Sequence, residues 1–325
     1  VDIRQLLELD GQRRTRLTQI EELRARRNTL NEDPKGQRPT GDQIAAGKQL
    51  KEELTGLETE LKGIEDDYDA LLKQVPNMPL EDVPVGASED ENVVARTEGE
   101  KPQFDFMPKS HWEIAETRDL IDKERATKVA GPRFAYIKGD LVRLQFAIIQ
   151  FVLATVGDEQ VIQKLIEKND LQLTAKPFTP VLPPAMIKTD VFAAMDRLEP
   201  RDDRYKVGEA EDDLWLQGSA EHTLGSMYKD EILDWSQLPI RYIGYSSSFR
   251  REAGTYGKDT EGIIRMHQFD KLEMEVFSTP ETGLDEHKLL CAIQEYLVQQ
   301  LGLPYQVIQK CTADIGKPNA RGIDL

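Results

Sequence analysis

The sequence predicts an α+β protein in which a helical arm precedes a body built around an antiparallel sheet. Residues 47–75 place glycine and then mainly aliphatic side chains at alternating steps of three and four, which is typical of a coiled-coil seam. Residues 249–277 contain two strand-like segments separated by a polar loop with glycines at 254, 257 and 262. This second pattern predicts two antiparallel strands joined by a glycine-rich loop.

Residues 1–78 are predicted to form an antiparallel pair of long helices. Ile and Leu recur at helical spacing between Ile3 and Leu30, and the seam of residues 47–75 lies on a second helix that is roughly 50 Å long. The segment between them, NEDPKGQRPTGD, contains two prolines and two glycines, which end a helix. Because such a hairpin has little core of its own, we expect it to project from the body as an arm.

The first predicted helix carries an excess of arginine. Residues 11–30 hold six arginines and two glutamates, whereas residues 42–74 hold nine acids and four lysines. The two helices can neutralise each other across the seam, or the excess arginines can bind RNA phosphates in a salt-sensitive contact. Charge alone leaves both interpretations open. The arginines concerned are Arg13, Arg14, Arg16, Arg24, Arg26 and Arg27.

The remaining chain is predicted to form a linker and a globular body. Residues 79–109 are rich in Pro, Asp and Glu and lack periodicity, so they are predicted to be a linker, and residues 110–325 are predicted to be the body. Apolar spacing in the body predicts a buried helix over Asp140–Val156 and a further helix over residues 222–233. A short strand before Gly218, a helix after Thr279 with apolar positions 289, 290, 293 and 297, and a strand over Tyr305–Gln309 complete the prediction.

Net charge, cysteine spacing and the length of apolar runs exclude several classes of protein. The net charge of −17 argues against a generally basic nucleic-acid coat, so any RNA contact must be a local surface. Cys291 and Cys311 have no metal-ligand spacing, and no metal site within the protein is predicted. The longest apolar run is too short to span a bilayer and no export signal opens the chain, so we expect a cytoplasmic protein without a membrane partner. The chain starts at Val1 and stops at Leu325 in a strand-like segment, so we expect a fragment.

The second predicted strand, residues 263–277, has one polar and one apolar face. Alternation places Arg265, His267, Phe269, Lys271, Glu273 and Glu275 on one side and Met266, Leu272, Met274 and Val276 on the other. Arg265 and Phe269 are about 13 Å apart along the strand, and so are Phe269 and Glu273. A guanidinium, an aromatic ring and a carboxylate at this spacing suit an extended ligand, such as a nucleotide joined to a small amino acid. The alternative is an amphipathic edge hairpin whose charged face is only solvated.

FRREAG followed by RMHQFDKLE resembles the second signature motif of class II aminoacyl-tRNA synthetases, in the form found in seryl-tRNA synthetases. The proline-rich residues 177–184 resemble the first motif of that family, which implies a homodimer. The resemblance implies an antiparallel-sheet catalytic domain, with the third motif lying beyond Leu325. The N-terminal hairpin resembles the family's tRNA-binding arm.

The resemblance also implies a reaction and its site residues. L-serine would be activated by ATP to seryl-adenylate, with Mg²⁺ bridging the phosphates, and then transferred to tRNA(Ser), with tRNA(Sec) as a further acceptor. Arg250 and Arg265 would be catalytic, holding the α-phosphate and the outer phosphates. The implied ATP-binding residues are Arg250, Arg251, Glu252 at the adenine edge, Met266 through its backbone, and Phe269 against the adenine face. The implied serine-binding residues are Ser219, Ala220, Glu221 and Glu273, and the arm arginines would bind tRNA.

Two other functions remain open. Because the third motif is missing, the chain could be a synthetase-like protein that binds RNA or a partner without ligase activity. It could also be an amino acid ligase with a carrier-protein acceptor, although the long predicted arm counts against this alternative. His111 is interpreted as a packing residue and His222 as a packing or solvated residue, and neither is predicted to be catalytic.

Overall fold

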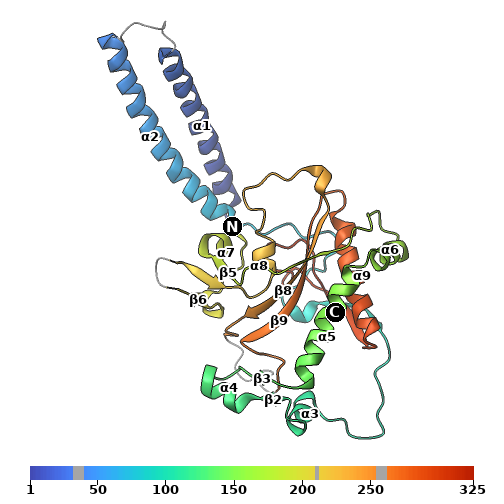
Figure 1. The fold of residues 1–325 in the computed structure, drawn as a ribbon. Helices are drawn as coiled ribbons and strands as arrows, with labels where there is room; N and C mark the ends of the chain where they lie inside the picture. Colours follow the sequence, from blue (N-terminus) through green and yellow to red (C-terminus); the bar gives the residue numbers. More distant parts are fainter. Residues whose placement is uncertain (32–39, 209–211, 254–261) are drawn as a thin grey trace. The chain divides into compact units, whose positions relative to one another are not determined.

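The computed structural model describes residues 1–31, 40–208, 212–253 and 262–325. They divide into two compact units, one formed by residues 1–83 with 312–321 and the other by residues 84–311 with 322–325 (Figure 1). The predicted domain boundaries at residues 78 and 109 stay a prediction.

The first unit is built on a helical hairpin. Helices α1 (Ile3–Asn31) and α2 (Gly41–Leu72) lie side by side (Figure 1). Thr40 caps α2 in a reciprocal capping box with Gln43, which fixes where the helix begins. The buried seam consists of Ile20, Leu23, Leu54 and Leu61, with Leu17, Leu50 and Leu57 packed against it. The predicted seam is therefore confirmed over its central part, whereas α2 ends before Val75.

The second unit is organised around strands β8 (Ile240–Phe249) and β9 (Gln268–Phe277). They pair antiparallel from Ile240 opposite Phe277 to Phe249 opposite Gln268, and β4 (Thr179–Val181) joins β8 in parallel. The prediction that the second strand starts at residue 263 is wrong, because β9 begins five residues later. Immediately before β9 the backbone no longer continues the ladder with β8. The His267 N–H, for example, donates to the Arg133 carbonyl oxygen at 3.0 Å.

Three smaller sheets complete the strand content of the described residues. Antiparallel pairing joins β1 (Val93–Glu98) to β10 (Tyr305–Gln309) and β10 to β11 (Ile323–Asp324). The other sheets contain β5 (Met186–Lys188), β7 (Leu214–Leu216) and β6 (Lys206–Val207), and β2 (Ile121–Asp122) with β3 (Tyr136–Ile137). Strand β1 lies within the stretch predicted to be a linker and was not predicted. The strand before Gly218 and the strand over Tyr305–Gln309 are confirmed.

The apolar face of β9 covers the main core. Leu272, Met274 and Val276 pack with Ile243 of β8 against helices α5 (Asp140–Val156), α6 (Glu159–Lys168) and α9 (Gly283–Gln300). Leu289 and Ile293 of α9 are buried here, and Leu290 and Leu297 pack against them, as predicted from their spacing. The apolar face predicted for β9 is thus confirmed for the residues that belong to the strand.

Two helix predictions need correction. Helix α5 is not buried along its length, because Leu144, Phe146 and Ile148 are 55%, 59% and 40% exposed, and only its C-terminal end enters the core. The helix predicted over residues 222–233 is a single turn, α8 (Glu221–Leu224), after which Asp230 adopts a positive φ of 62° that ordinary helices do not contain. The remaining helices are α3 (His111–Thr117), α4 (Lys123–Ala130) and α7 (Thr189–Ala194). Short 3₁₀ turns cover Glu89–Glu91, Arg201–Asp203 and Trp235–Gln237.

Within the described part of the chain, no single helix is long and apolar enough to cross a bilayer. Helices α5 and α6, bent by 68° at their junction, meet the length and composition criteria only as a pair. Neither cysteine forms a disulfide with another described residue; Cys311 is buried and Cys291 is partly buried.

Candidate active site

Arg250 and Phe269 meet where the β8–β9 ladder ends. Arg250 directly follows β8, and Phe269 lies opposite Ser248 near the start of β9. The Arg250 guanidinium carbon is 5.3 Å from the centroid of the Phe269 ring, and its Nε donates to the Gly218 carbonyl oxygen at 3.1 Å. A cation and an aromatic ring therefore lie together on the polar face that the sequence predicts.

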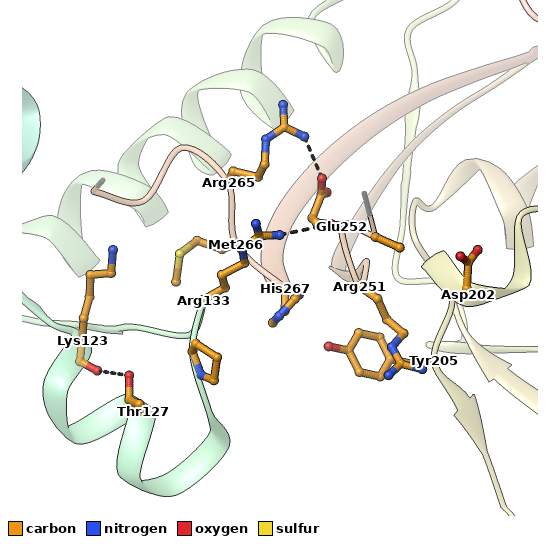
Figure 2. Close-up of a pocket in the computed structure, with 12 residues that line it drawn as sticks. Lys123, Thr127, Arg133, Asp202, Tyr205, Arg251, Glu252, Arg265, Met266 and His267 are labelled. Atoms are coloured by element: carbon orange, nitrogen blue, oxygen red, sulfur yellow. Dashed lines mark hydrogen bonds and ion pairs between the residues drawn. The ribbon is translucent and has the colours of Figure 1, made fainter. Parts of the chain in front are cut away.

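Arg265 and Glu252 form an ion pair next to this corner. Nη1 of Arg265 lies 2.7 Å from Oε2 of Glu252, and the Glu252 side chain is only 14% exposed. Figure 2 shows a second guanidinium, that of Arg133, reaching the same residue; its Nη1 donates to the Glu252 carbonyl oxygen at 3.1 Å. No pattern in the sequence predicts this contact, because Arg133 precedes Glu252 by 119 residues.

A cavity of about 740 Å³ opens beside this ion pair. Arg251, Glu252, Arg265 and Met266 line it, whereas Arg250 and Phe269 are not among its lining residues. The Arg251 guanidinium carbon lies 5.7 Å from the centroid of the Tyr205 ring (Figure 2), whereas that of Arg250 lies over the Phe269 ring, so the two side chains take different directions. Other residues of the cavity wall are Lys123, Thr127, Pro132, Arg133, Asp202, Tyr205, Ala253 and His267.

Ser219 and Glu273 come together on the same sheet face, farther along β9. Ser219 Oγ donates to Glu273 Oε2 at 2.6 Å and accepts hydrogen bonds from Lys271 Nζ and the Glu221 N–H, each at 3.2 Å. Lys271 also forms an ion pair with Glu273. Ala220 is fully buried beneath this group. All four residues implied for serine binding therefore lie close to one another. Lys271 lies with them and was not predicted.

Gly244 explains how the Ser219 segment approaches the sheet so closely. Gly244 lies opposite Glu273 in the β8–β9 ladder. A Cβ atom at this position would lie 2.5 Å from Leu224 Cδ1 and 3.0 Å from the Ala220 Cβ. Because glycine has no Cβ, helix α8 and the preceding turn can lie directly on the strand, within hydrogen-bonding distance of Glu273.

A third carboxylate lies on this face. Burial, together with repulsion by Glu221 and Glu273, raises the pKa of Glu275 to about 8. The guanidinium of Arg197, at 2.7 Å, pairs with Glu221. Glu275 was placed on the polar face by alternation but without a role, and Arg197 was missed because it precedes Glu221 in a separate loop.

The two histidines singled out from the sequence have different environments. His222 is buried, accepts a hydrogen bond from the Gly218 N–H at 3.1 Å and packs 4.7 Å from the Phe192 ring, so the packing prediction is confirmed. Its pKa is lowered to about 3, chiefly by burial and then by Arg204 and Arg250. His111 is exposed and accepts a hydrogen bond from the Ile263 N–H at 3.4 Å.

Four of the six arm arginines have ion-pair partners within the helical hairpin. Arg13 and Arg14 pair with Asp10 on the same helix. Arg16 pairs with Glu60 at 3.0 Å and Arg24 with Glu58 at 2.8 Å, which link α1 to α2. Arg26 and Arg27 are exposed and have no ion pair to any of the described residues. Neutralisation across the seam is therefore confirmed for Arg16 and Arg24, whereas Arg13 and Arg14 are paired within α1, and Arg26 and Arg27 remain available to another partner.

Residues 1–79 match the family described as "Seryl-tRNA synthetase N-terminal domain", and residues 205–322 match "tRNA synthetase class II core domain (G, H, P, S and T)". The serine–tRNA ligase of Trichlorobacter lovleyi is 38% identical over the whole chain, which covers 74% of that protein. The chain belongs to the seryl-tRNA synthetase family. The serine–tRNA ligase of Nitrosopumilus maritimus is 36% identical over the whole of this chain, which covers 74% of that protein.

Solved structures agree with this assignment. The seryl-tRNA synthetase of Pyrococcus horikoshii, crystallised with ATP, superposes with a TM-score of 0.79 at 34% identity, over 99% of this chain and 73% of that one. The cytoplasmic enzyme of Naegleria fowleri, crystallised with AMP, gives a TM-score of 0.76 at 24% identity, over 99% and 71%, and supports the fold alone. The predicted class II fold and the predicted serine–tRNA ligase class are confirmed.

Proposed function

We propose that this protein binds ATP and L-serine end to end along the polar face of β8 and β9. One observation carries the proposal. The Arg250–Phe269 pair lies at one end of this face, and the Ser219–Glu273 hydrogen bond lies farther along the same strand. Phe269 and Glu273 are both on β9 and, four residues apart, point to the same side. The nucleotide part of an elongated adenylate would therefore contact Arg250 and Phe269, and its amino-acid part would contact Ser219 and Glu273.

At the nucleotide end, Phe269 stacks on adenine and Arg250 holds the α-phosphate. The Glu252 carboxylate accepts from the adenine amino group, Met266 offers its backbone to the base, and Arg265 binds the outer phosphates. Arg251, which faces Tyr205, supports this corner from the adjacent cavity. Guanidinium groups suit phosphate oxygens because they are planar and permanently charged.

At the serine end, Glu273 and Glu221 receive the ammonium group and the Ser219 hydroxyl contacts the serine side chain. The buried Ala220 holds Ser219 and Glu221 against the sheet. Lys271 balances the charge of Glu273 when no substrate is bound. A cluster of carboxylates on a partly buried face favours an ammonium ligand over a neutral one.

The chemistry requires positioning rather than a side-chain nucleophile. A carboxylate oxygen of serine forms a bond to the α-phosphorus, and the bond from that phosphorus to the bridging oxygen breaks, so pyrophosphate leaves. Arg250 stabilises the charge that accumulates on the α-phosphate. Mg²⁺, when bound, would neutralise the phosphates. Among the described residues no group of three His, Cys, Asp or Glu side chains is arranged to hold a metal ion, so phosphate oxygens are its expected ligands.

The arm supplies the contact to tRNA. The exposed Arg26 and Arg27 are the arginines of α1 best placed to bind phosphates. The other four can bind phosphates only if their ion pairs within the hairpin open: Arg13, Arg14, Arg16 and Arg24. We assign tRNA(Ser) as the acceptor, with tRNA(Sec) as a second one, and place the reaction in the cytoplasm where tRNA is charged. Deleting residues 1–75 should spare adenylate formation and abolish charging.

A second copy of the chain is the expected partner in a homodimer. Leu144, Phe146 and Ile148 are exposed apolar side chains of α5, with Leu144 and Ile148 on one face of the helix and Phe146 on the opposite one, and Leu182, within the segment resembling the first motif, is 80% exposed. Apolar faces of this kind usually contact another protein. Light scattering should give twice the mass of one chain, and Phe146→Glu should shift it towards the monomer. A monomeric wild-type protein would rule the dimer out.

Serine-dependent exchange of pyrophosphate into ATP by the full-length protein tests the proposed function directly. We expect exchange with L-serine and none without an amino acid. The absence of exchange with serine, in a protein that is folded and binds tRNA, would instead support a binding protein without ligase activity.

A further inference from the structure

The turn after β8 holds a non-glycine residue in a left-handed conformation. Glu252 has φ of 52°, a region that side-chain-bearing residues rarely adopt unless their surroundings enforce it. Three contacts from distant segments fix this turn. Arg133 Nη1 donates to the Glu252 carbonyl oxygen at 3.1 Å, and Asp203 accepts from the Arg251 N–H at 3.0 Å and from the Ala253 N–H at 3.2 Å. The backbone at Glu252, from which the carboxylate projects, is therefore held from outside the hairpin.

His267 fixes the other side of the same turn. Its carbonyl oxygen accepts from the Arg250 N–H and its ring Nδ1 bonds the Arg250 carbonyl oxygen, each at 3.0 Å. Because a carbonyl oxygen only accepts, Nδ1 must carry the proton. The His267 N–H donates to the Arg133 carbonyl oxygen at 3.0 Å, and the Phe134 ring lies 5.3 Å from the imidazole. Arg133 and His267 are thus hydrogen-bonded to each other. Arg133 bonds the backbone of Glu252, and His267 bonds the backbone of Arg250.

We propose that Arg133 and His267 are positioning residues of the nucleotide site. They act through the main chain, since Arg133 restrains Glu252 and His267 restrains Arg250. Figure 2 shows the Arg133 guanidinium directed at the backbone of Glu252, Arg265 above it at the carboxylate, and His267 below them. Loss of the restraint should let the turn relax, so that the Glu252 carboxylate no longer faces the adenine edge and the Arg250 guanidinium no longer faces the α-phosphate. This inference rests on the proposed function.

Substitution of Arg133 tests the adenine end. Arg133→Ala should raise the KM for ATP in pyrophosphate exchange roughly tenfold or more, because a hydrogen bond from a charged donor is lost. The KM for serine should stay within about twofold, since the Ser219–Glu273 group does not contact Arg133. The ratio of kcat/KM for ATP over GTP should fall, because Glu252 would no longer select the adenine amino group. Arg133→Lys should restore part of the loss, and Arg118→Ala, an exposed arginine at the end of α3, should match the wild type.

Substitution of His267 tests the phosphate end. His267→Asn keeps a side-chain N–H near the Arg250 carbonyl oxygen, whereas His267→Leu removes it. We expect His267→Leu to lower kcat for exchange roughly tenfold or more and His267→Asn to recover most of it. Thermal unfolding of each variant separates misfolding from misplacement, and kinetics are compared only for variants that unfold within a few degrees of the wild type.

The outcomes separate this inference from the proposed function. If the wild type shows no serine-dependent exchange, the proposed function itself fails. If the wild type is active and a folded Arg133→Ala variant keeps its KM for ATP and its ATP over GTP preference, Arg133 has no positioning role. Equal losses in the KM for ATP and for serine would indicate a general structural effect and would also overturn the inference. For His267, equal activity of the Leu and Asn variants would do the same.

Discussion

The guanidinium of Arg265 and the carboxylate of Glu252 lie 2.7 Å apart, bonded to each other. The proposed site assigns these side chains to opposite ends of ATP, the outer phosphates and the adenine edge. The ion pair thus joins two groups that the proposed site assigns to separate parts of the nucleotide. If the proposed function holds, ATP replaces this ion pair with two separate contacts.

The ion pair should matter more for ATP binding than for stability. Arg265 is 34% exposed at its side chain, so losing the pair should cost only about 1 kcal/mol in the free energy of unfolding. Arg265→Ala should nevertheless raise the KM for ATP roughly tenfold or more through lost phosphate contacts. Exchange kinetics and urea unfolding of the same variants give both quantities. An unchanged KM for ATP would remove Arg265 from the site.

Glu273 should be required for serine activation. Glu273→Ala removes the acceptor of the 2.6 Å bond from Ser219 and leaves Lys271 without its partner. We expect serine-dependent exchange to fall roughly hundredfold or more, with the fold intact by circular dichroism. Glu281→Ala, an exposed glutamate just before α9, serves as the matched control. Near-normal exchange by Glu273→Ala would show that the serine ammonium binds elsewhere.

Gly244 should tolerate no larger side chain. In Gly244→Ala the new methyl group would meet Leu224 and Ala220, both buried, so either α8 moves or the core is strained. We expect a loss of about 1–3 kcal/mol in stability and a higher KM for serine, because Ser219 is displaced from Glu273. Gly63→Ala on α2, where a Cβ atom meets open space, should be neutral or stabilising. A Gly244→Ala protein with wild-type stability would contradict the close packing of α8 on β8.

Glu275 should make stability depend on pH. An unfolded glutamate ionises near 4.5, whereas in the folded protein the Glu275 pKa is about 8 because of burial and of Glu221 and Glu273, opposed by Lys271 and Arg197. Folding therefore takes up about one proton between these values, and stability falls as pH rises from about 4.5 to about 8. Glu275→Gln stays neutral, so its free energy of unfolding should exceed that of the wild type by an amount that grows across this window and then levels off. Urea unfolding at several pH values measures the difference; parallel curves would show that Glu275 is ionised throughout.

The unpaired arm arginines should contribute more to tRNA charging than the paired ones. Replacing Arg26 and Arg27 with alanine should lower kcat/KM for tRNA and reduce the salt dependence of binding by about one phosphate contact for each residue that binds. Exchange without tRNA should be unchanged. The matched pair of substitutions, Arg16→Ala with Arg24→Ala, removes guanidiniums already bonded to Glu60 and Glu58 and should cost less. Equal losses in both double variants would show that the internal ion pairs open on binding.

The local pattern of the sequence identified the elements that bury one face. The steps of three and four residues found the Leu54 and Leu61 seam, and strand alternation found the apolar face of Leu272, Met274 and Val276. The same patterns failed where burial did not follow periodicity. Helix α5 has apolar residues at helical spacing but leaves two of them, Leu144 and Ile148, exposed. Strand β1 lacks any strand pattern because its side chains are almost all exposed on both faces.

The sequence by itself determined which side chains share a face of β9 and which motif they belong to, because a strand's alternation depends only on its own residues. The tertiary structure alone decided which distant residues reach them. Arg133, Tyr205, Asp203 and Arg197 act on the site from segments outside the hairpin, and Gly244 matters only because α8 lies across it. These contacts follow from the packing of whole elements against one another, and no periodicity within a single segment encodes them.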